Sequence, residues 1–272
     1  YAQRYANDGT AVGAEFRVNA TTSGEQYDPE VAALADGRFV VVWRDNGQDG
    51  SSYGVYAQRY NADGSAAGGE FRVNTTTSDA QYEPAVAMLE GGGFVVAWRS
   101  DNQDGSSAGV YAQRYAADGS ALGGEFRVNE STVGGQYQPD VTALAGGGFA
   151  VTWRNDNYDV SGTGSSQDVY VREYDAAGAA LGGQARVNTP TPTQTLQYEP
   201  AIASLGAGNY VVVWRSDDQE NDGGYSGIYQ ALFGDAAELP RQANPELNDF
   251  GGTLVFGENA VNAAPQRIDA VV

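Results

Sequence analysis

The sequence predicts an all-β protein, a β-propeller of four-stranded blades, and three observations support this fold class. First, the chain repeats itself: Trp stands at 43, 98, 153 and 214, each time followed by Arg, at spacings of 55, 55 and 61 residues. Second, each unit reads as four short strands joined by Gly-Gly and Asp-Gly hairpin signals. Third, no helical periodicity competes with this pattern. Four-stranded units repeated around an axis form a propeller, and we expect five blades, with four as the alternative.

The strands of a unit differ in composition. The first begins with Gln-Tyr-x-Pro and continues with small residues, such as those at 31–34, which suit a strand crowded near a central axis. The second, for example 94–98, is apolar on both faces, so we expect it to be covered on both sides. The third and fourth, for example 110–115 and 125–129, alternate and carry Arg, Gln and Glu, as outer strands would.

Counting the strands gives the domain organisation. We expect propeller repeats over 1–244, with a surplus hairpin at 1–19 followed by units at about 26–74, 81–129, 136–188 and 197–244. Because the chain begins inside a repeat, it reads as a fragment or a processed product. Residues 245–272 break the repeat. They are expected either to close the ring, through a degenerate hairpin around 251–256, or to open a different module.

Composition excludes several functions. The 272 residues carry a net charge of −20, all fifteen basic residues are Arg, and Lys, His and Cys are absent. Serine–histidine and cysteine–histidine nucleophiles, His-ligated zinc and disulfides are therefore impossible. So acidic a chain is not expected to bind nucleic acid, whose affinity rests on Lys and Arg. No apolar run approaches the length of a membrane-spanning helix, so no membrane insertion is expected.

The repeated motifs resemble a known family. The series Gln-Tyr-x-Pro, Gly-Phe-Val-Val-x-Trp, Gln-Asp-Gly-Ser-Ser, Val-Tyr-Ala-Gln-Arg-Tyr and Glu-Phe-Arg-Val-Asn is similar to a repeat of RTX-type calcium-binding adhesins and hemolysin-like proteins, large bacterial proteins exported by type I secretion. This resemblance covers about 1–244. The stretch 252–265 looks like the opening of an immunoglobulin- or cadherin-like module. The glycine–aspartate nonapeptide that names RTX proteins is absent, so calcium binding by that route is not implied.

The resemblance implies a function. We expect a secreted or cell-surface, non-catalytic structural or adhesion module, whose partners are other copies of itself or cell-surface glycans and proteins. The alternative is a glycan-binding lectin with one pocket per blade. A glycan-processing enzyme is the least favoured, because the acidic residues repeat from blade to blade whereas an active site normally breaks symmetry. The prediction is therefore that the protein is not an enzyme.

Asp-rich loops follow each second strand. Carboxylates, Asn carbonyls and glycine turns close together suit a hard cation, so these loops predict a calcium site. The alternative is that Asp and Asn cap their own turns. The candidate ligands are Asp45, Asp49, Asp101, Asp104, Asp156, Asp159, Asp217, Asp218 and Asp222.

The Trp-Arg pairs are the second candidate site. Each Trp shares a strand face with apolar residues two and four positions earlier, which favours core packing. Each Arg faces the other way, and its expected partner is the acidic residue of Tyr-x-Pro: Asp28, Glu83 or Glu199, with Gln138 in the third unit. A glycan-binding surface is the alternative. Its residues would be Tyr27, Arg44, Tyr82, Arg99, Tyr137, Arg154, Tyr198 and Arg215.

Overall fold

A computed structural model describes residues 1–158, 165–188, 196–217, 226–234, 266 and 267. These residues form antiparallel sheets and contain no α-helix, only the short 3₁₀ turns η1 (Glu90–Gly92) and η2 (Ala145–Gly147). In this part of the chain no helix is long and apolar enough to cross a membrane. The chain divides into two compact units, Tyr1–Arg127 and Val128–Val272.

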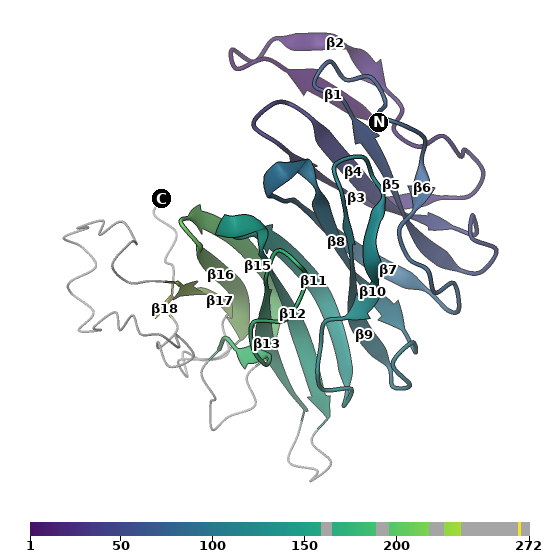
Figure 1. The fold of residues 1–272 in the computed structure, drawn as a ribbon. Helices are drawn as coiled ribbons and strands as arrows, with labels where there is room; N and C mark the ends of the chain where they lie inside the picture. Colours follow the sequence, from purple (N-terminus) through teal and green to yellow (C-terminus); the bar gives the residue numbers. More distant parts are fainter. Residues whose placement is uncertain (159–164, 189–195, 218–225, 235–265, 268–272) are drawn as a thin grey trace. The chain divides into compact units, whose positions relative to one another are not determined.

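The first unit holds a hairpin and two four-stranded sheets (Figure 1). The hairpin pairs β1 with β2, and the sheets have the strand orders β3-β4-β5-β6 and β7-β8-β9-β10. Each sheet follows chain order, as successive hairpins require. The strands are β1 (Ala2–Tyr5), β2 (Ala11–Phe16), β3 (Gln26–Ala33), β4 (Phe39–Asn46), β5 (Tyr53–Tyr60), β6 (Phe71–Arg72), β7 (Gln81–Met88), β8 (Phe94–Asp101), β9 (Ala108–Tyr115) and β10 (Ala121–Arg127).

The second unit repeats the arrangement with the orders β11-β12-β13-β14 and β15-β16-β17-β18. Its last sheet differs from the expectation. The fourth strand is the pair Gln266–Arg267, beyond the expected unit boundary at 244, and 235–265 lie outside the described residues. The strands are β11 (Gly135–Ala143), β12 (Phe149–Tyr158), β13 (Ser165–Tyr174), β14 (Ala185–Arg186), β15 (Gln197–Gly206), β16 (Asn209–Asp217), β17 (Ser226–Phe233) and β18 (Gln266–Arg267). The domain division at 244 stays a prediction.

Every Trp is in the core, as its strand pattern predicts. The indole of Trp98 is fully buried, and Trp43 is 3% exposed. An aromatic pair closes the other end of each second strand: Phe39 stacks on Tyr60 with ring centres 4.7 Å apart, and the equivalent pairs in the other three sheets lie at 4.8 Å. Because the second strand is covered on both faces, the sheets pack against each other through apolar side chains.

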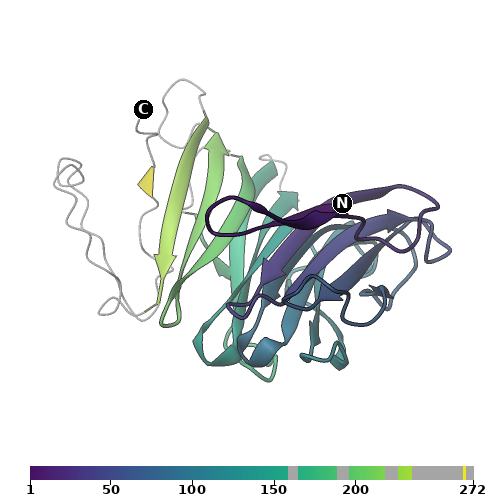
Figure 2. The same ribbon diagram turned by 90° about the horizontal axis from the view of Figure 1, so that it is seen from above.

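Contacts between neighbouring elements of the first unit recur at a shift of 55 residues. Arg4 of the hairpin donates a hydrogen bond to the carbonyl of Ala62 in the next sheet (2.6 Å). Arg59 of that sheet donates to the carbonyl of Ala117 in the sheet after it (2.8 Å). The hairpin is thus held against the first sheet as that sheet's outer strands are held against the second. Figure 2 shows the hairpin, in dark purple, beside the first sheet.

The first strand of every sheet carries the same irregularity. The residue before proline in Tyr-x-Pro has left-handed backbone geometry: φ is 51° at Asp28, 52° at Glu83, 54° at Gln138 and 50° at Glu199. The pairing register shifts at the same place, for example between Tyr27 and Glu30. Such a conformation costs a non-glycine residue on the order of 1–3 kcal/mol, so the surrounding structure must enforce it. The bulge sets the direction of the Tyr and acidic side chains beside it.

Candidate functional site

Arginine and tyrosine side chains alternate across the first strands of the first unit. We call this the unit-1 ladder: Tyr27, Arg44, Tyr53, Tyr82 and Arg99. The Arg44 guanidinium carbon lies 4.9 Å from the ring centre of Tyr27, 4.8 Å from that of Tyr53 and 5.2 Å from that of Tyr82. Arg99 lies 5.0 Å from Tyr82, so the stack runs from one sheet into the next.

The second unit contains the same arrangement, the unit-2 ladder: Tyr137, Arg154, Tyr198 and Arg215. Arg154 lies 4.8 Å from the ring centre of Tyr137 and 5.8 Å from that of Tyr198. Arg215 lies 4.4 Å from Tyr198. The structure thus brings together, within each unit, the Tyr and Arg residues that the sequence singled out.

Strand geometry explains both ladders. Each Arg follows the buried Trp of the second strand, so it points to the opposite face. In the first sheet, Tyr27 is the cross-strand partner of Arg44. In the third sheet, Tyr137 is the partner of Arg154. Aromatic rings and planar guanidinium groups attract each other at such distances.

Carboxylates neutralise the ladder arginines. Arg44 lies 2.8 Å from Asp28, which confirms the expected pairing, and Arg99 lies 2.8 Å from Asp101. The remaining polar contacts are Arg99 with Glu83 (3.8 Å), Arg154 with Asp156 (3.0 Å), Arg154 with the Gln138 amide oxygen (3.4 Å), Arg215 with Glu199 (3.8 Å) and Arg215 with Asp217 (3.7 Å). The third unit therefore uses Gln138 where the others use an acid, as its sequence indicates.

The Asp-rich loops do different work in the structure. Asp49 accepts a hydrogen bond from the Ser51 amide (2.9 Å), and Asp104 accepts one from the Ser106 amide (3.0 Å), which are turn-capping contacts. Asp101, Asp156 and Asp217 pair with ladder arginines. Asp159, Asp218 and Asp222 lie outside the described residues. Among the residues with a described placement, no group of three acidic side chains is arranged to hold a metal. Calcium binding stays a prediction.

Asp45 behaves differently from its loop neighbours. Its side chain is fully buried and accepts hydrogen bonds from the Gln26 amide nitrogen (2.8 Å) and the Gln48 backbone amide (3.2 Å). Burial raises the pKa of this carboxyl, and the two hydrogen bonds oppose the shift. Asp45 is therefore part of the framework between the strands.

Asp140 on β11 is a site residue that sequence reasoning missed. It stands where Ala85 and Ala201 stand in two other units, so it breaks the symmetry of the repeat. Its carboxylate accepts hydrogen bonds from the backbone amides of Ile202 on β15 and Val141, both at 2.8 Å. Burial raises the pKa of Asp140 despite these two bonds. A unit-by-unit alignment at this position is the sequence signal that reveals it.

Glu199 lies on β15, across from Asp140. Its backbone amide donates to the Gln138 side chain (3.1 Å), three residues before the bond from Ile202 to Asp140. The Glu199 side chain is 63% exposed. Two carboxylates in contrasting environments, one buried and one solvated, thus flank the same junction of first strands, beside the unit-2 ladder. Such contrast is what separates an acid from a base in enzymes that use two carboxyl groups.

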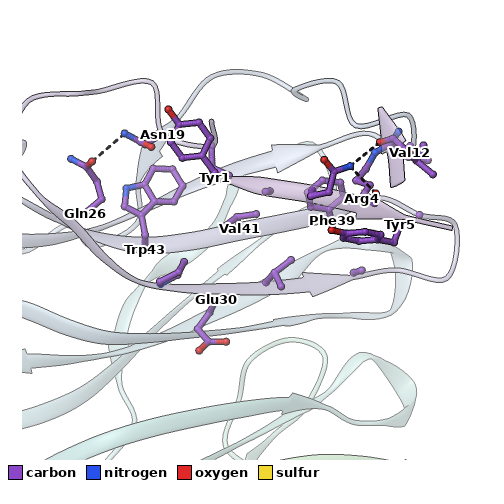
Figure 3. Close-up of a pocket in the computed structure, with 18 of the residues that line it drawn as sticks. Tyr1, Arg4, Tyr5, Val12, Asn19, Gln26, Glu30, Phe39, Val41 and Trp43 are labelled. Atoms are coloured by element: carbon purple, nitrogen blue, oxygen red, sulfur yellow. Dashed lines mark hydrogen bonds between the residues drawn. The ribbon is translucent and has the colours of Figure 1, made fainter. Parts of the chain in front are cut away.

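A pocket of about 900 Å³ lies between the N-terminal hairpin and the first sheet (Figure 3). Tyr1, Tyr5 and Val12 of the hairpin line one side, and Val31 and Trp43 line the other. The sequence holds a signal for it: Tyr1 and Tyr5 open the same Tyr-Ala-Gln-Arg-Tyr series that is buried at 56–60.

Comparison with known proteins identifies the fold. No family model and no curated protein matches the chain. Among solved structures, an alpha-L-arabinofuranosidase of Fusarium graminearum in complex with arabinobiose superposes with a TM-score of 0.58 at 13% identity, over 92% of this chain and 69% of that one. An alpha-L-arabinanase of Penicillium chrysogenum gives 0.56 at 18%, over 89% and 66%. A Hadza microbial sialidase gives 0.52 at 12%, over 75% of this chain and 44% of that one.

These neighbours confirm the β-propeller fold of four-stranded blades. The ring and its blade count stay predictions, since no closed sheet is detected. The neighbours also correct two predictions. The expected non-catalytic adhesion module and the prediction that the protein is not an enzyme are wrong, because the solved structures of this fold that resemble the chain are named as glycan-processing enzymes. Blade-to-blade symmetry misled the prediction, since it drew attention to the repeated acids and away from Asp140.

Proposed function

We propose that the protein is a glycan-processing β-propeller that takes a glycan onto the unit-2 ladder and acts on it with Asp140 and Glu199. The observation that carries this proposal is the symmetry-breaking carboxyl of Asp140 beside the stacked rings. A fold shared with arabinanase, arabinofuranosidase and sialidase structures supports the same reaction class.

Each part of the site has a chemical task. The rings of Tyr137 and Tyr198 offer apolar faces for sugar rings, while Arg154 and Arg215 offer N–H donors to hydroxyl groups. Glycosidic bonds are commonly hydrolysed by two carboxyl groups, one protonated and one ionised. Burial favours the protonated form of Asp140, so it takes the role of general acid. Exposed Glu199 takes the role of base or nucleophile.

The proposed substrate is a neutral glycan. Arg154 already has Asp156 as its counter-charge, and Arg215 has Glu199 and Asp217. No positive charge is therefore left over for a uronic or sialic acid at this ladder. The net charge of −20 further repels acidic chains, because long-range repulsion lowers the local concentration of like-charged ligands. Since such substrates are found outside cells, we also propose a secreted or cell-surface location.

Sugar release from defined polysaccharides tests the proposal. Arabinan and other neutral chains are compared with polygalacturonate, using the full chain, Asp140→Asn and Glu199→Gln. We expect release from a neutral chain, lost by at least about 100-fold in both variants while binding persists, as removal of acid–base groups predicts. Activity should fall as pH rises through the raised pKa of Asp140, which a framework role would not produce. Asp118→Asn, an exposed turn carboxylate, is the matched control.

Two results would contradict this assignment. Glycan binding without sugar release in the full chain would leave the lectin alternative. Release that survives in both variants would move the chemistry away from the unit-2 ladder. Melting curves of each variant show whether loss of the Asp140–Ile202 bond has unfolded the site, and only variants with an unchanged melting temperature are compared.

A further inference from the structure

The pocket beside the N-terminal hairpin has the contacts of a blade that lacks two strands. β1 and β2 form a two-stranded sheet, whereas β5 pairs with both β4 and β6 in the sheet that follows. Within the described residues, no strand pairs with the other edge of β1. The hairpin nevertheless occupies the place of a third and fourth strand, because its bonds to the first sheet repeat those between the first and second sheets.

Two further pairs of bonds support this equivalence at the 55-residue shift. The Tyr60 hydroxyl donates to the carbonyl of Val18 (3.4 Å), as the Tyr115 hydroxyl donates to that of Val73 (3.1 Å). Glu70 accepts from the Ala20 amide at 2.7 Å, and Glu125 accepts from the Thr75 amide at 2.7 Å. The hairpin is therefore in register with the blades, and the first- and second-strand positions beside it are the pocket.

The tyrosines of the repeat measure what the pocket lacks. Tyr56 and Tyr60 are 4% and 5% exposed, but the equivalent Tyr1 and Tyr5 are 80% and 66% exposed. On the facing sheet, Val31 is 63% exposed, whereas Val141 at the same place is 5% exposed. Identical side chains are thus buried where a first–second hairpin is present and open where it is missing. An apolar surface of this kind marks an interaction site.

We propose that the pocket is a docking site for one further β-hairpin with the chemistry of β7 and β8. Its second strand would pair with β1 in the register that joins β8 to β9, where Phe94 faces Tyr115 and Trp98 faces Tyr111. An aromatic residue would then stack on Tyr5, as Phe94 stacks on Tyr115 at 4.8 Å. A Trp would cover Tyr1. The occupant is a partner segment with the second-strand pattern aromatic-Val-Val-x-Trp-Arg, bound by strand addition.

The test supplies that hairpin to the full chain. In one arm, a synthetic peptide of residues 79–102 is added; in the other, residues 79–110 are copied onto the N-terminus, which covers the case of a peptide that does not fold. Nitration of Tyr1 and Tyr5 by tetranitromethane is followed by mass spectrometry, with Tyr137 as the reference. The control hairpin carries Phe94→Ser and Trp98→Ser.

We expect nitration of Tyr5 to fall at least about tenfold with the native hairpin and not with the control, as burial inside a packed sheet requires. The extended chain should also melt at least about 5 °C above its control. Equal nitration and equal melting for native and control extensions overturn the proposal. So does protection of Tyr5 by a neutral glycan, or by dimerisation of the unextended chain that is lost in Tyr5→Arg, because the pocket then has another occupant.

Discussion

Arg44 of the first four-stranded sheet lies over the ring of Tyr82 in the second, with 5.2 Å between its guanidinium carbon and the ring centre. The same guanidinium contacts Tyr27 and Tyr53 of its own sheet and pairs with Asp28. One side chain thus joins two sheets through a planar group with rings on more than one side. A change of shape at this position therefore acts on both sheets, even if the charge is kept.

Arg44→Lys is expected to lower the free energy of unfolding by about 0.5–2 kcal/mol, because a compact ammonium keeps the charge but cannot stack on several rings. Urea unfolding at neutral pH measures the change. Arg38→Lys is the matched control, since Arg38 is 40% exposed and its ion pair with Asp36 involves no ring. Equal losses for the two variants would show that stacking adds nothing to stability.

Trp98→Ala is expected to cost about 3–5 kcal/mol, because it opens a cavity around a fully buried indole. Thermal and urea unfolding both measure this loss. Leu122→Ala serves as the control, since Leu122 is 41% exposed and leaves no cavity. A stable Trp98→Ala variant that has lost glycan binding would be the opposite of what core packing predicts.

Glu125→Gln is expected to flatten the acid limb of the stability curve. Burial of Glu125 raises its pKa, but hydrogen bonds from Thr75, Thr76 and Gln103 outweigh burial and bring the pKa below 4.5. The stability from these bonds is present above the unfolded pKa and is lost as pH falls through the folded pKa. Unfolding free energies across the carboxylate range measure it. A parallel loss with acid in wild type and variant would exclude Glu125 as the cause.

Asp45→Asn should show the opposite sign. Burial raises the pKa of Asp45, so its contribution is present below the unfolded pKa and is lost as pH rises through the folded pKa. We expect the variant to gain stability at neutral pH and to gain nothing in acid. The repeat supports the substitution, because Asn155 occupies the equivalent place and accepts from Gln136 at 3.1 Å. A loss at neutral pH would mean that the charge of Asp45 is needed there.

Sequence periodicity predicted the parts of the fold that depend on side-chain alternation. The burial of Trp43 and the pairing of Arg44 with Asp28 both follow from a period of two along a strand. The left-handed residue at Asp28 could not be predicted, because nothing in Tyr-x-Pro composition requires a positive φ there. Without that bulge, the stacking of Arg44 on several rings has no sequence signature.

Short outer strands were also beyond sequence reasoning. The run 70–74 reads as a five-residue strand, but only Phe71–Arg72 pair, because Asn74 and Glu70 bond to other parts of the repeat. Pairing of Gln266–Arg267 with β17 depends on a long-range contact that two residues cannot encode in a pattern. Asp140 was missed for a different reason, since its environment comes from β15 and not from its neighbours in sequence.

The 55-residue translation of contacts within the first unit bears on how such a chain can change length. Arg4 meets Ala62 as Arg59 meets Ala117, so each junction is a copy of another. A duplication or deletion of one whole unit in the coding sequence would join surfaces that already fit each other. Unequal recombination between the near-identical segments is thus tolerated by the contacts themselves, whereas a shift by any other number of residues would bring Arg4 and Arg59 opposite unrelated backbone.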